Sequence, residues 1–371
     1  MEMEINSKDL DLCLTNVKKV VPNKASMDVL KNFLFKVTKD SLTVCGSDLE
    51  FCLSIQIPCE SDGELTFMVP AEYMFPLVKG LPDQVLRFVF DNQRITVYHN
   101  NGHFFIPISR DVVTYPSAHT FADNSVVNVM AVERFAGSYA LVAPFVDKPD
   151  DSIDAMFSSV NFEFTERGLC VVGSNGRGLA LREIPLENVS ATQFLISASA
   201  VSLLKVFNTC FAGSDIRITS DDSFVSFVSD RISFDVRKSA VKYKNYRSVI
   251  PASRNASASV DRRFLLGCLQ RVESICSNHL VSIEFGNDAM KLTASDLDAG
   301  VQSEDSLPCI YEGEPLSFAM NTGLLFNASK VLGAEKINFD LMSPTMPAKV
   351  YPSEEDGNST DLILLMPMAM F

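Results

Sequence analysis

This sequence of 371 residues lacks the features of a membrane protein, a secreted protein or a metalloprotein. No apolar run reaches the ~18 residues that a helix needs to cross a bilayer. The first residues, MEMEINSKDLD, are too acidic and polar for a signal peptide. Nine cysteines are scattered without a Cys-x-x-Cys pair, as reduced core thiols are, and the four histidines show no metal-ligand spacing. We therefore expect a soluble, cytoplasmic protein without a metal site.

Signs of an enzyme are also few. The segment Gly173–Gly178 lacks the Lys-Ser/Thr pair of a phosphate-binding loop and the helix of a dinucleotide fold, which favours a turn between strands. Asp48 and Asp296 each end a small-Ser-Asp string, so equivalent turns explain them better than paired catalytic carboxylates do. A Cys-His nucleophile stays open, because its partners need not be close in sequence. We expect no catalytic residue and no cofactor.

What the sequence does contain is one pattern repeated three times. Apolar residues recur at i, i+4, i+7 and i+11, which is one face of a helix, from Leu10, Phe135 and Leu265 onward. These starts lie 125 and 130 residues apart. Each helical stretch is followed by two strand-like runs, a second helical stretch and further strands. A period this long predicts three copies of one domain rather than a solenoid. The predicted helical stretches are Ser7–Val21, Pro70–Leu81, Ala131–Pro144, Ala198–Phe211, Asp261–Cys276 and Asn321–Gly333.

The acidic charge of the chain is unevenly distributed. A net charge of −14 at pH 7 disfavours binding to nucleic acid, which is itself densely negative. The six predicted helical stretches, however, carry ten basic residues against six acidic ones, so the acidic excess lies elsewhere. Random scatter over solvated helix faces is the alternative explanation.

Several strings together resemble one family along the whole chain. They are Leu30–Val37, Gly46–Glu50, Val69–Ala71, Lys79–Pro82, Ser174–Ala180, Tyr246–Pro251 and Leu365–Met368. In this order they resemble the bacterial sliding clamp, the β subunit of the replicative DNA polymerase. The resemblance implies an α+β fold with three tandem copies of a two-helix, two-sheet domain, at 1–126, 127–253 and 254–371. Two polar linkers, Pro116–Phe121 and Arg254–Ser259, are expected near the crossings.

The resemblance also implies how such a chain works. Two subunits would form a homodimeric ring of six domains, each chain supplying half, with helices lining a central hole. Duplex DNA would pass through without base contacts, so the ring would slide regardless of sequence. The implied partners are the replicative polymerase catalytic subunit, the clamp loader and other replication and repair proteins with a clamp-binding motif. No membrane and no catalysis are involved.

The expected DNA-facing residues are basic residues on the helices, and one on a loop. They are Lys18, Lys19, Lys24, Lys79, Arg134, Lys205, Arg262, Arg263, Arg271 and Lys330. Each alone is also explained as an ordinary solvated charge. The sequence departs from the family at Ser197–Ala200, which is small, and at Asp147–Asp151, which is acidic, so we expect lighter DNA contact in the second domain.

A groove between the second and third domains is expected to bind apolar partner peptides. By position in the family, its residues would be Phe157, Ser174, Gly176, Leu179, Lys244, Ser248, Val249, Leu324, Thr345, Pro347, Leu364, Met366, Pro367 and Met368. Methionine is flexible and polarisable, which suits several partners. Lys244 and Ser248 replace a frequent proline and arginine, and Leu324 replaces an aromatic found in some members, so peptide preference is expected to differ. A final core strand at Leu362–Met370 is the alternative.

For the dimer, the family pairs an edge of the first domain with an edge of the third domain of the other subunit. This implies contacts by Phe104, Phe105, Ile106, Ile275, Asp298 and Glu304. An interior strand at Phe104–Ile108 is the alternative. Two other functions also stay open: a repeat-built enzyme, which predicts a deep pocket with titratable groups, and a peptide adaptor, which predicts the groove without a basic helix surface.

Overall fold

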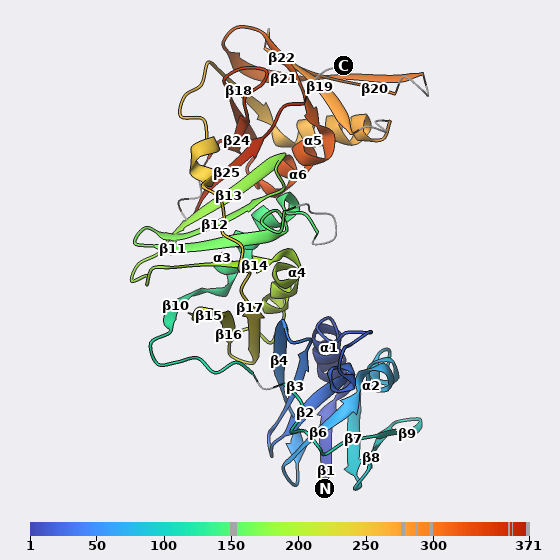
Figure 1. The fold of residues 1–371 in the computed structure, drawn as a ribbon. Helices are drawn as coiled ribbons and strands as arrows, with labels where there is room; N and C mark the ends of the chain where they lie inside the picture. Colours follow the sequence, from blue (N-terminus) through green and yellow to red (C-terminus); the bar gives the residue numbers. More distant parts are fainter. Residues whose placement is uncertain are drawn as a thin grey trace. The chain divides into compact units, whose positions relative to one another are not determined.

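The computed structural model describes residues 1–116, 118–148, 154–275, 279–286, 288–296, 300–354, 357 and 359–368 (Figure 1). They form two compact units. The first combines Met1–Ala136 with Ser202–Lys238, and the second combines Gly137–Val201 with Ser239–Phe371. No helix of the described residues is long and apolar enough to span a membrane.

The first unit contains two antiparallel sheets. The smaller sheet has the order β5 (Glu60–Ser61), β1 (Glu2–Asn6), β7 (Val85–Phe90), β8 (Arg94–His99) and β9 (Gly102–Pro107). The larger sheet has the order β10 (Val126–Ala131), β15 (Asp215–Ser220), β16 (Phe224–Ser229), β17 (Ile232–Arg237), β4 (Phe51–Pro58), β3 (Ser41–Ser47), β2 (Asn32–Val37) and β6 (Leu65–Pro70). The β17–β4 pair joins strands from the first and second predicted domains in one sheet.

The second unit repeats this junction. Its long sheet has the order β14 (Thr192–Ser197), β11 (Ser159–Thr165), β12 (Gly168–Ser174), β13 (Gly178–Pro185), β25 (Thr360–Leu365), β24 (Ala348–Pro352), β23 (Lys336–Leu341), β18 (Ala256–Asp261), β21 (Val301–Glu312), β20 (Ala289–Asp296), β19 (Leu280–Gly286) and β22 (Leu316–Asn321). The β13–β25 pair joins the second and third predicted domains, as β4–β17 joins the first and second (Figure 1).

Among the described residues, each of the six predicted helical stretches contains an α-helix. These helices are α1 (Ser7–Val17), α2 (Ala71–Val78), α3 (Val132–Val142), α4 (Ala198–Leu203), α5 (Arg262–Glu273) and α6 (Thr322–Val331). Each follows directly on a strand. Short 3-10 helices lie at Asp28–Lys31, Ala143–Phe145, Leu204–Asn208 and Tyr246–Val249. One prediction was wrong: Ala256–Ser259 is part of β18 and not of a linker, because its small residues Ala256 and Ala258 are buried between two neighbouring strands.

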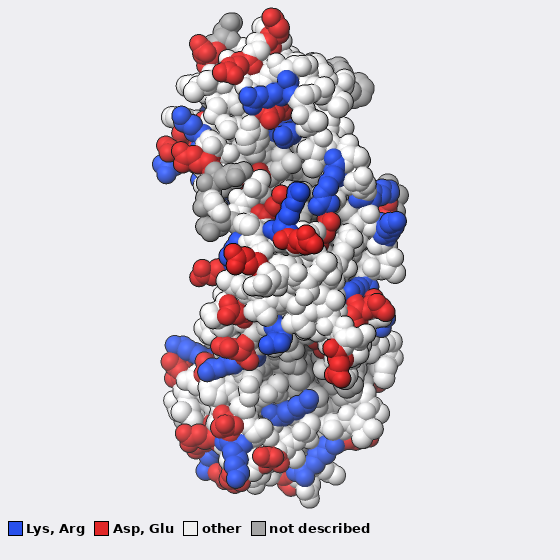
Figure 2. Space-filling model, turned by 90° about the vertical axis from the view of Figure 1, so that its left-hand side faces the viewer, with Lys and Arg blue, Asp and Glu red and all other residues white. Residues whose placement is uncertain are grey.

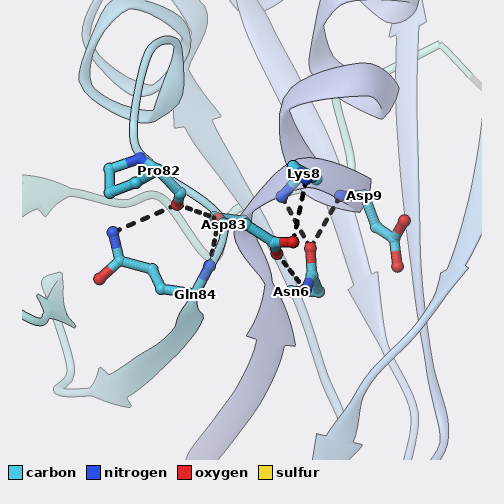
Figure 3. A network of polar contacts seen from close by, with 7 residues as sticks. Asn6, Lys8, Asp9, Pro82, Asp83 and Gln84 are labelled. Atoms are coloured by element: carbon cyan, nitrogen blue, oxygen red, sulfur yellow. Dashed lines mark hydrogen bonds and ion pairs between the residues drawn. The ribbon is translucent and has the colours of Figure 1, made fainter.

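Asx residues fix where several helices start. The Asn6 side chain accepts hydrogen bonds from the first amides of α1, and Asp261 does the same for α5. The Asn6 side-chain amide donates to Asp83 at 3.0 Å, and the Lys8 ammonium lies 3.0 Å from Asp83. Figure 3 shows these residues side by side. These contacts tie the start of α1 to the loop that follows α2.

The repeated apolar face packs against a repeated small residue. Leu10, Leu14 and Val17 of α1 are fully buried. A Cβ atom on Gly46 would lie 2.8 Å from Val17 Cγ1, and one on Gly173 would lie 2.6 Å from Val146 Cγ2. Both distances are too short for a side chain, so close packing against these valines requires glycine at the start of these two predicted turns.

Candidate functional site

An apolar cavity of about 230 Å³ lies in the second unit. We call it the Leu364 groove. Its wall consists of Met156, Phe157, Ser174, Gly176, Arg177, Gly178, Leu179, Tyr243, Lys244, Asn245, Tyr246, Val249, Pro347, Leu364 and Met366. Nine of the fourteen residues predicted for the partner groove therefore lie around one cavity: Phe157, Ser174, Gly176, Leu179, Lys244, Val249, Pro347, Leu364 and Met366.

The floor of the Leu364 groove is formed by side chains of neighbouring strands in one sheet. Leu179 of β13 stands directly opposite Leu364 of β25, which is 3% exposed. Met156, Tyr243 and Tyr246 pack against this pair in one buried cluster. The floor thus offers apolar and aromatic surface to a ligand while its own backbone groups are satisfied in the sheet.

One edge of the groove is the turn between β12 and β13. The Asn175 Oδ1 atom accepts hydrogen bonds from the amides of Arg177 and Gly178, at 3.1 and 2.8 Å. Gly176 has a φ of +80°, which favours glycine, and a Cβ there would lie 3.2 Å from the Phe157 ring. The turn explains Gly173–Gly178 as a strand connection, as predicted.

The rim of the groove carries positive charge. The Lys244 ammonium lies 3.1 Å from Asp154 and 5.9 Å from the Phe157 ring centre. Arg177 is exposed, and its carbonyl accepts a hydrogen bond from the Met366 amide at 2.9 Å. Val249 and Met366 supply exposed apolar surface beside these charges.

Five predicted groove residues do not line the cavity. They are Ser248, Leu324, Thr345, Pro367 and Met368. The Ser248 hydroxyl donates to the Asn245 carbonyl at 2.8 Å, and the Met368 amide donates to Ala319 of β22. Leu324 is on α6, and Thr345 is in the turn before Pro347. Sequence reasoning missed six wall residues: Met156, Arg177, Gly178, Tyr243, Asn245 and Tyr246. Arg177, Gly178 and Tyr246 lie in strings that resemble the family but were not named for the groove.

Two of the cysteines are not suited to nucleophilic chemistry. Burial raises the pKa of Cys52 to about 12 and that of Cys170 to about 11. Cys170 lies 3.3 Å from the Tyr246 hydroxyl, which donates to Glu163 at 2.9 Å. These thiols remain protonated near neutral pH. Within the described ranges, no group of three His, Cys, Asp or Glu side chains is arranged to hold a metal ion.

Three of the four predicted DNA-facing residues of the first domain lie directly after helices, and the fourth lies in a loop. Lys18 and Lys19 follow α1, where Lys18 Nζ donates to Asn23 at 2.9 Å and Lys19 Nζ donates to Asn16 at 2.9 Å. Partial burial lowers the pKa of Lys18. Lys24 is exposed in the loop that follows, and Lys79 ends α2 with its ammonium 5.2 Å from the Phe75 ring centre.

The remaining predicted DNA-facing residues differ in their exposure and in their hydrogen-bond partners. Arg262 Nε of α5 donates to the Ala334 carbonyl at 2.7 Å. Arg271 binds Asp305 with two hydrogen bonds, at 2.9 and 3.0 Å, so its charge is partly neutralised. Arg263 is exposed, and no ion pair within the described ranges involves it. Arg134 of α3 is half-buried, and two are exposed: Lys205, in the 3-10 helix after α4, and Lys330, in α6.

The first predicted dimer edge is an edge strand. Among the described strands, β9 pairs only with β8, which decides between the two alternatives for Phe104–Ile108. Phe105 is 63% exposed, whereas the side chain of Ile106 is 1% exposed and belongs to the core of its own unit. Phe104 is half-buried.

The second predicted dimer edge lies on β21. Residues 301–308 of β21 pair with β20 on one side, and only residues 309–312 pair with β18 on the other. The first part of β21 therefore has an open edge within the described sheet. Glu304 lies there and pairs with Lys291 at 3.0 Å. Ile275 is half-buried after α5, and Asp298 lies outside the described residues.

Charges of both signs lie side by side on the face drawn in Figure 2. Lys and Arg side chains are interspersed there with Asp and Glu side chains, and neither sign forms one continuous patch. The charge of this face alone is therefore mixed, although the chain as a whole is acidic.

Comparisons with known proteins agree along the whole chain. A family model described as DNA polymerase III beta subunit, N-terminal domain, matches residues 1–117, and one for the C-terminal domain matches residues 247–368. A beta sliding clamp of Staphylococcus aureus is 20% identical over 98% of each chain. The DNA polymerase III beta subunit of Thermotoga maritima covers 100% of both chains, with a TM-score of 0.89 and 23% identity. The beta subunit from a DNA polymerase of Streptococcus pyogenes, at 16% identity and the same coverage, gives 0.91.

Proposed function

We propose that this chain, which belongs to the DNA polymerase III beta subunit family, is a sliding clamp that holds the replicative polymerase on duplex DNA. The fold is the sliding clamp fold, with three domains of the α+β type. The family is a non-catalytic processivity factor, which confirms the expectation that the chain is not an enzyme. We place the domain boundaries at 1–126, 127–253 and 254–371, because β10 and β18 each start a new strand–helix unit there.

The distribution of charge carries this proposal. The basic residues named for DNA contact lie on helices, directly after them or, for Lys24, on the loop after α1, whereas the chain has a net charge of −14. Lysine and arginine side chains that meet phosphates without touching bases give binding that is independent of sequence. A closed ring would then keep the protein on DNA by topology, and tight binding would not be needed.

The two open strand edges support a homodimer. Strand β9 presents Phe105 on one edge, and the first part of β21 presents an unpaired edge on the other. An open edge with exposed apolar residues is a template for pairing with another chain. Because the edges differ, each copy would use β9 against β21 of the other, and two such contacts close a ring of six domains.

The Leu364 groove supports the partner function. Its buried aromatic and aliphatic floor fits the apolar anchors of a short peptide, and flexible Met366 at its rim suits more than one partner. We infer that the polymerase, the clamp loader and repair proteins compete for this groove, in the cytoplasm where DNA is replicated.

Retention on circular DNA tests the ring. The wild-type protein is expected to stay on a nicked circular duplex and to be lost when the circle is linearised. Replacing Lys24, Arg262 and Arg263 by glutamate should shorten the residence time several-fold at low salt, because each contact releases counterions. Replacing Lys39, Arg167 and Arg231, which are exposed in strand-to-strand turns, is the matched control. If the protein is lost equally from circular and linear DNA, the proposed ring is rejected.

Removal of Met366–Phe371 tests the groove. This variant should lose affinity for an apolar peptide derived from the polymerase, as measured by titration, because Met366 lines the cavity. The dimer mass in light scattering should stay the same, since the edges of β9 and β21 are intact. Unchanged peptide affinity would contradict the assignment of the groove.

A further inference from the structure

A second cavity, of about 200 Å³, repeats the geometry of the Leu364 groove in the first unit. We call it the Asp235 groove. Its wall consists of Ser47, Leu49, Glu50, Phe51, Cys52, Pro116, His119, Phe224 and Asp235. It lies where β4 of the first domain pairs with β17 of the second, as the Leu364 groove lies where β13 pairs with β25.

The turns that border the two cavities have the same hydrogen bonds. Asp48 Oδ1 accepts from the amides of Glu50 and Phe51, at 3.0 and 2.7 Å. Ser47 Oγ donates to the Phe51 carbonyl at 2.9 Å, the distance at which Ser174 Oγ donates to Gly178. Leu49 has a φ of +80°, the value of Gly176. These matches make Ser47–Phe51 the equivalent of Ser174–Gly178, residue by residue.

The strand beyond the floor matches as well. The Arg237 amide donates to the Glu50 carbonyl at 2.9 Å, as the Met366 amide donates to Arg177. In the ladder, Cys52 stands opposite Asp235, as Leu179 stands opposite Leu364. Asp235 therefore occupies the position of Leu364, and Cys52 that of Leu179.

The equivalence shows what has changed between the two cavities. A carboxylate that is 5% exposed replaces the leucine at the centre of the floor. Asp235 accepts hydrogen bonds from Ser226 Oγ at 2.5 Å and from the His119 amide at 3.3 Å, and carboxylate oxygens have room for further donors. Phe51 and Phe224 supply aromatic walls, and Leu49 is 45% exposed at the mouth.

The other ionisable side chains near the cavity already have partners. Glu50 lies 3.5 Å from Arg237, whose guanidinium also lies 5.1 Å from the Phe224 ring centre. His119 Nε2 lies 2.5 Å from Asp221 and its ring stacks on Phe224. The floor carboxylate is thus the charge left facing the cavity, and a cation is its complement.

We propose that the Asp235 groove is a second partner site, which binds a segment of a partner protein through an arginine side chain inserted against Asp235. A guanidinium matches a carboxylate with two parallel hydrogen bonds, and its stem can pack against apolar surface such as Phe51 in the wall. The flanking apolar residues of the segment contact Leu49 and Phe51. The site rests on the cavity and its equivalence to the Leu364 groove, and not on the binding of DNA.

A pair of capped peptides tests this site on the full-length protein. The probe is Ac-Leu-Arg-Leu-Phe-NH2, and its matched control carries citrulline, which is neutral and nearly the same shape, in place of arginine. Saturation-transfer NMR should detect the arginine peptide and give about tenfold weaker affinity for the citrulline peptide, the difference expected for hydrogen bonds to a charged group. Absence of binding, or equal affinity for the two peptides, would overturn the proposal.

Variants locate the binding. Asp235→Asn should weaken the arginine peptide about tenfold and leave the citrulline peptide unchanged. Asp91→Asn removes the same charge from an exposed turn and is the matched control. Because Asp235 accepts internal hydrogen bonds, Leu49→Trp provides a second variant, which obstructs the mouth from an exposed position. Full affinity in both Asp235→Asn and Leu49→Trp would overturn the proposal, and a failure of retention on circular DNA would not affect it.

Discussion

The turns at Ser47–Phe51 and Ser174–Gly178 share their hydrogen bonds and the sign of φ at their third residue, yet one borders an anionic floor and the other an apolar floor. The backbone of the junction is set by the Asx residue, by the serine and by the ladder beside it. The two floor residues, Asp235 and Leu364, are set by none of these. An internal repeat can therefore keep its architecture while each copy acquires its own ligand chemistry.

The neighbours of the two floor residues explain why each is stable where it lies. Across the ladder, Asp235 faces Ser226, which donates a hydrogen bond to it, whereas Leu364 faces Lys349. A buried carboxylate without such donors would be strongly unfavourable. A change of the floor residue therefore requires a matching change of the residue opposite it on the neighbouring strand.

The largest effect is expected when the floor residue of the Leu364 groove is replaced by that of the Asp235 groove. Leu364→Asp should weaken an apolar partner peptide at least ~100-fold, because the buried anchor site becomes charged. The variant should also lose on the order of 2–3 kcal/mol of stability, since Lys349 opposite offsets part of the desolvation. Peptide titration and urea unfolding measure the two effects.

Leu364→Met is the control for that variant. It conserves the volume and polarity of the floor and should cost less than ~1.5 kcal/mol. An aspartate variant that binds the apolar peptide as well as the methionine variant would show that the floor does not select ligands.

A smaller test concerns the third residue of each turn. Gly176→Leu should destabilise the chain by about 2 kcal/mol, because a Cβ at φ +80° is strained and would lie 3.2 Å from Phe157. Leu49→Gly should have a much smaller effect of either sign, since relief of the same strain is offset by the freedom of glycine in the unfolded chain. Thermal unfolding compares the two. Equal effects would mean that the turns are not equivalent.

The sequence predicted the helices and turns that recur in each domain, but it did not predict the residues that distinguish one cavity from the other. The apolar faces starting at Leu10, Phe135 and Leu265 predicted helices because a helical period is local. The small residues Gly46 and Gly173 were also visible in the sequence, because each begins a short turn string that recurs in the repeat. Position in the family placed nine groove residues around one cavity. Tyr243 and Met156 were missed, because they reach the cavity through tertiary packing that no local pattern encodes.

The Asp235 groove was missed for a different reason. Its residues come from the β3–β4 turn, the crossing after Tyr115 and strands β16 and β17, and the paired residues Cys52 and Asp235 are 183 positions apart (235 − 52). The register that places Cys52 opposite Asp235 decides the chemistry of the floor, and a shift of β17 by one residue would turn Asp235 to the other face of the sheet. Ile106 was named for the dimer edge by its position in the family. Its side chain is buried in its own unit, and alternation along β9 alone does not show which face is covered.

The smallest predicted effect is a pH dependence that belongs to one groove only. Burial raises the pKa of Asp235, so the folded chain binds this proton more tightly than the unfolded chain does. Its contribution therefore lowers stability as the pH rises from about 4 through the folded pKa, by up to about 1.4 kcal/mol per pH unit. Asp235→Asn should remove that slope in urea unfolding between pH 4 and 7, whereas Leu364→Asn should leave it in place. If the slope survives in Asp235→Asn, the proton is bound elsewhere, and burial of Asp235 is not the cause of the pH dependence.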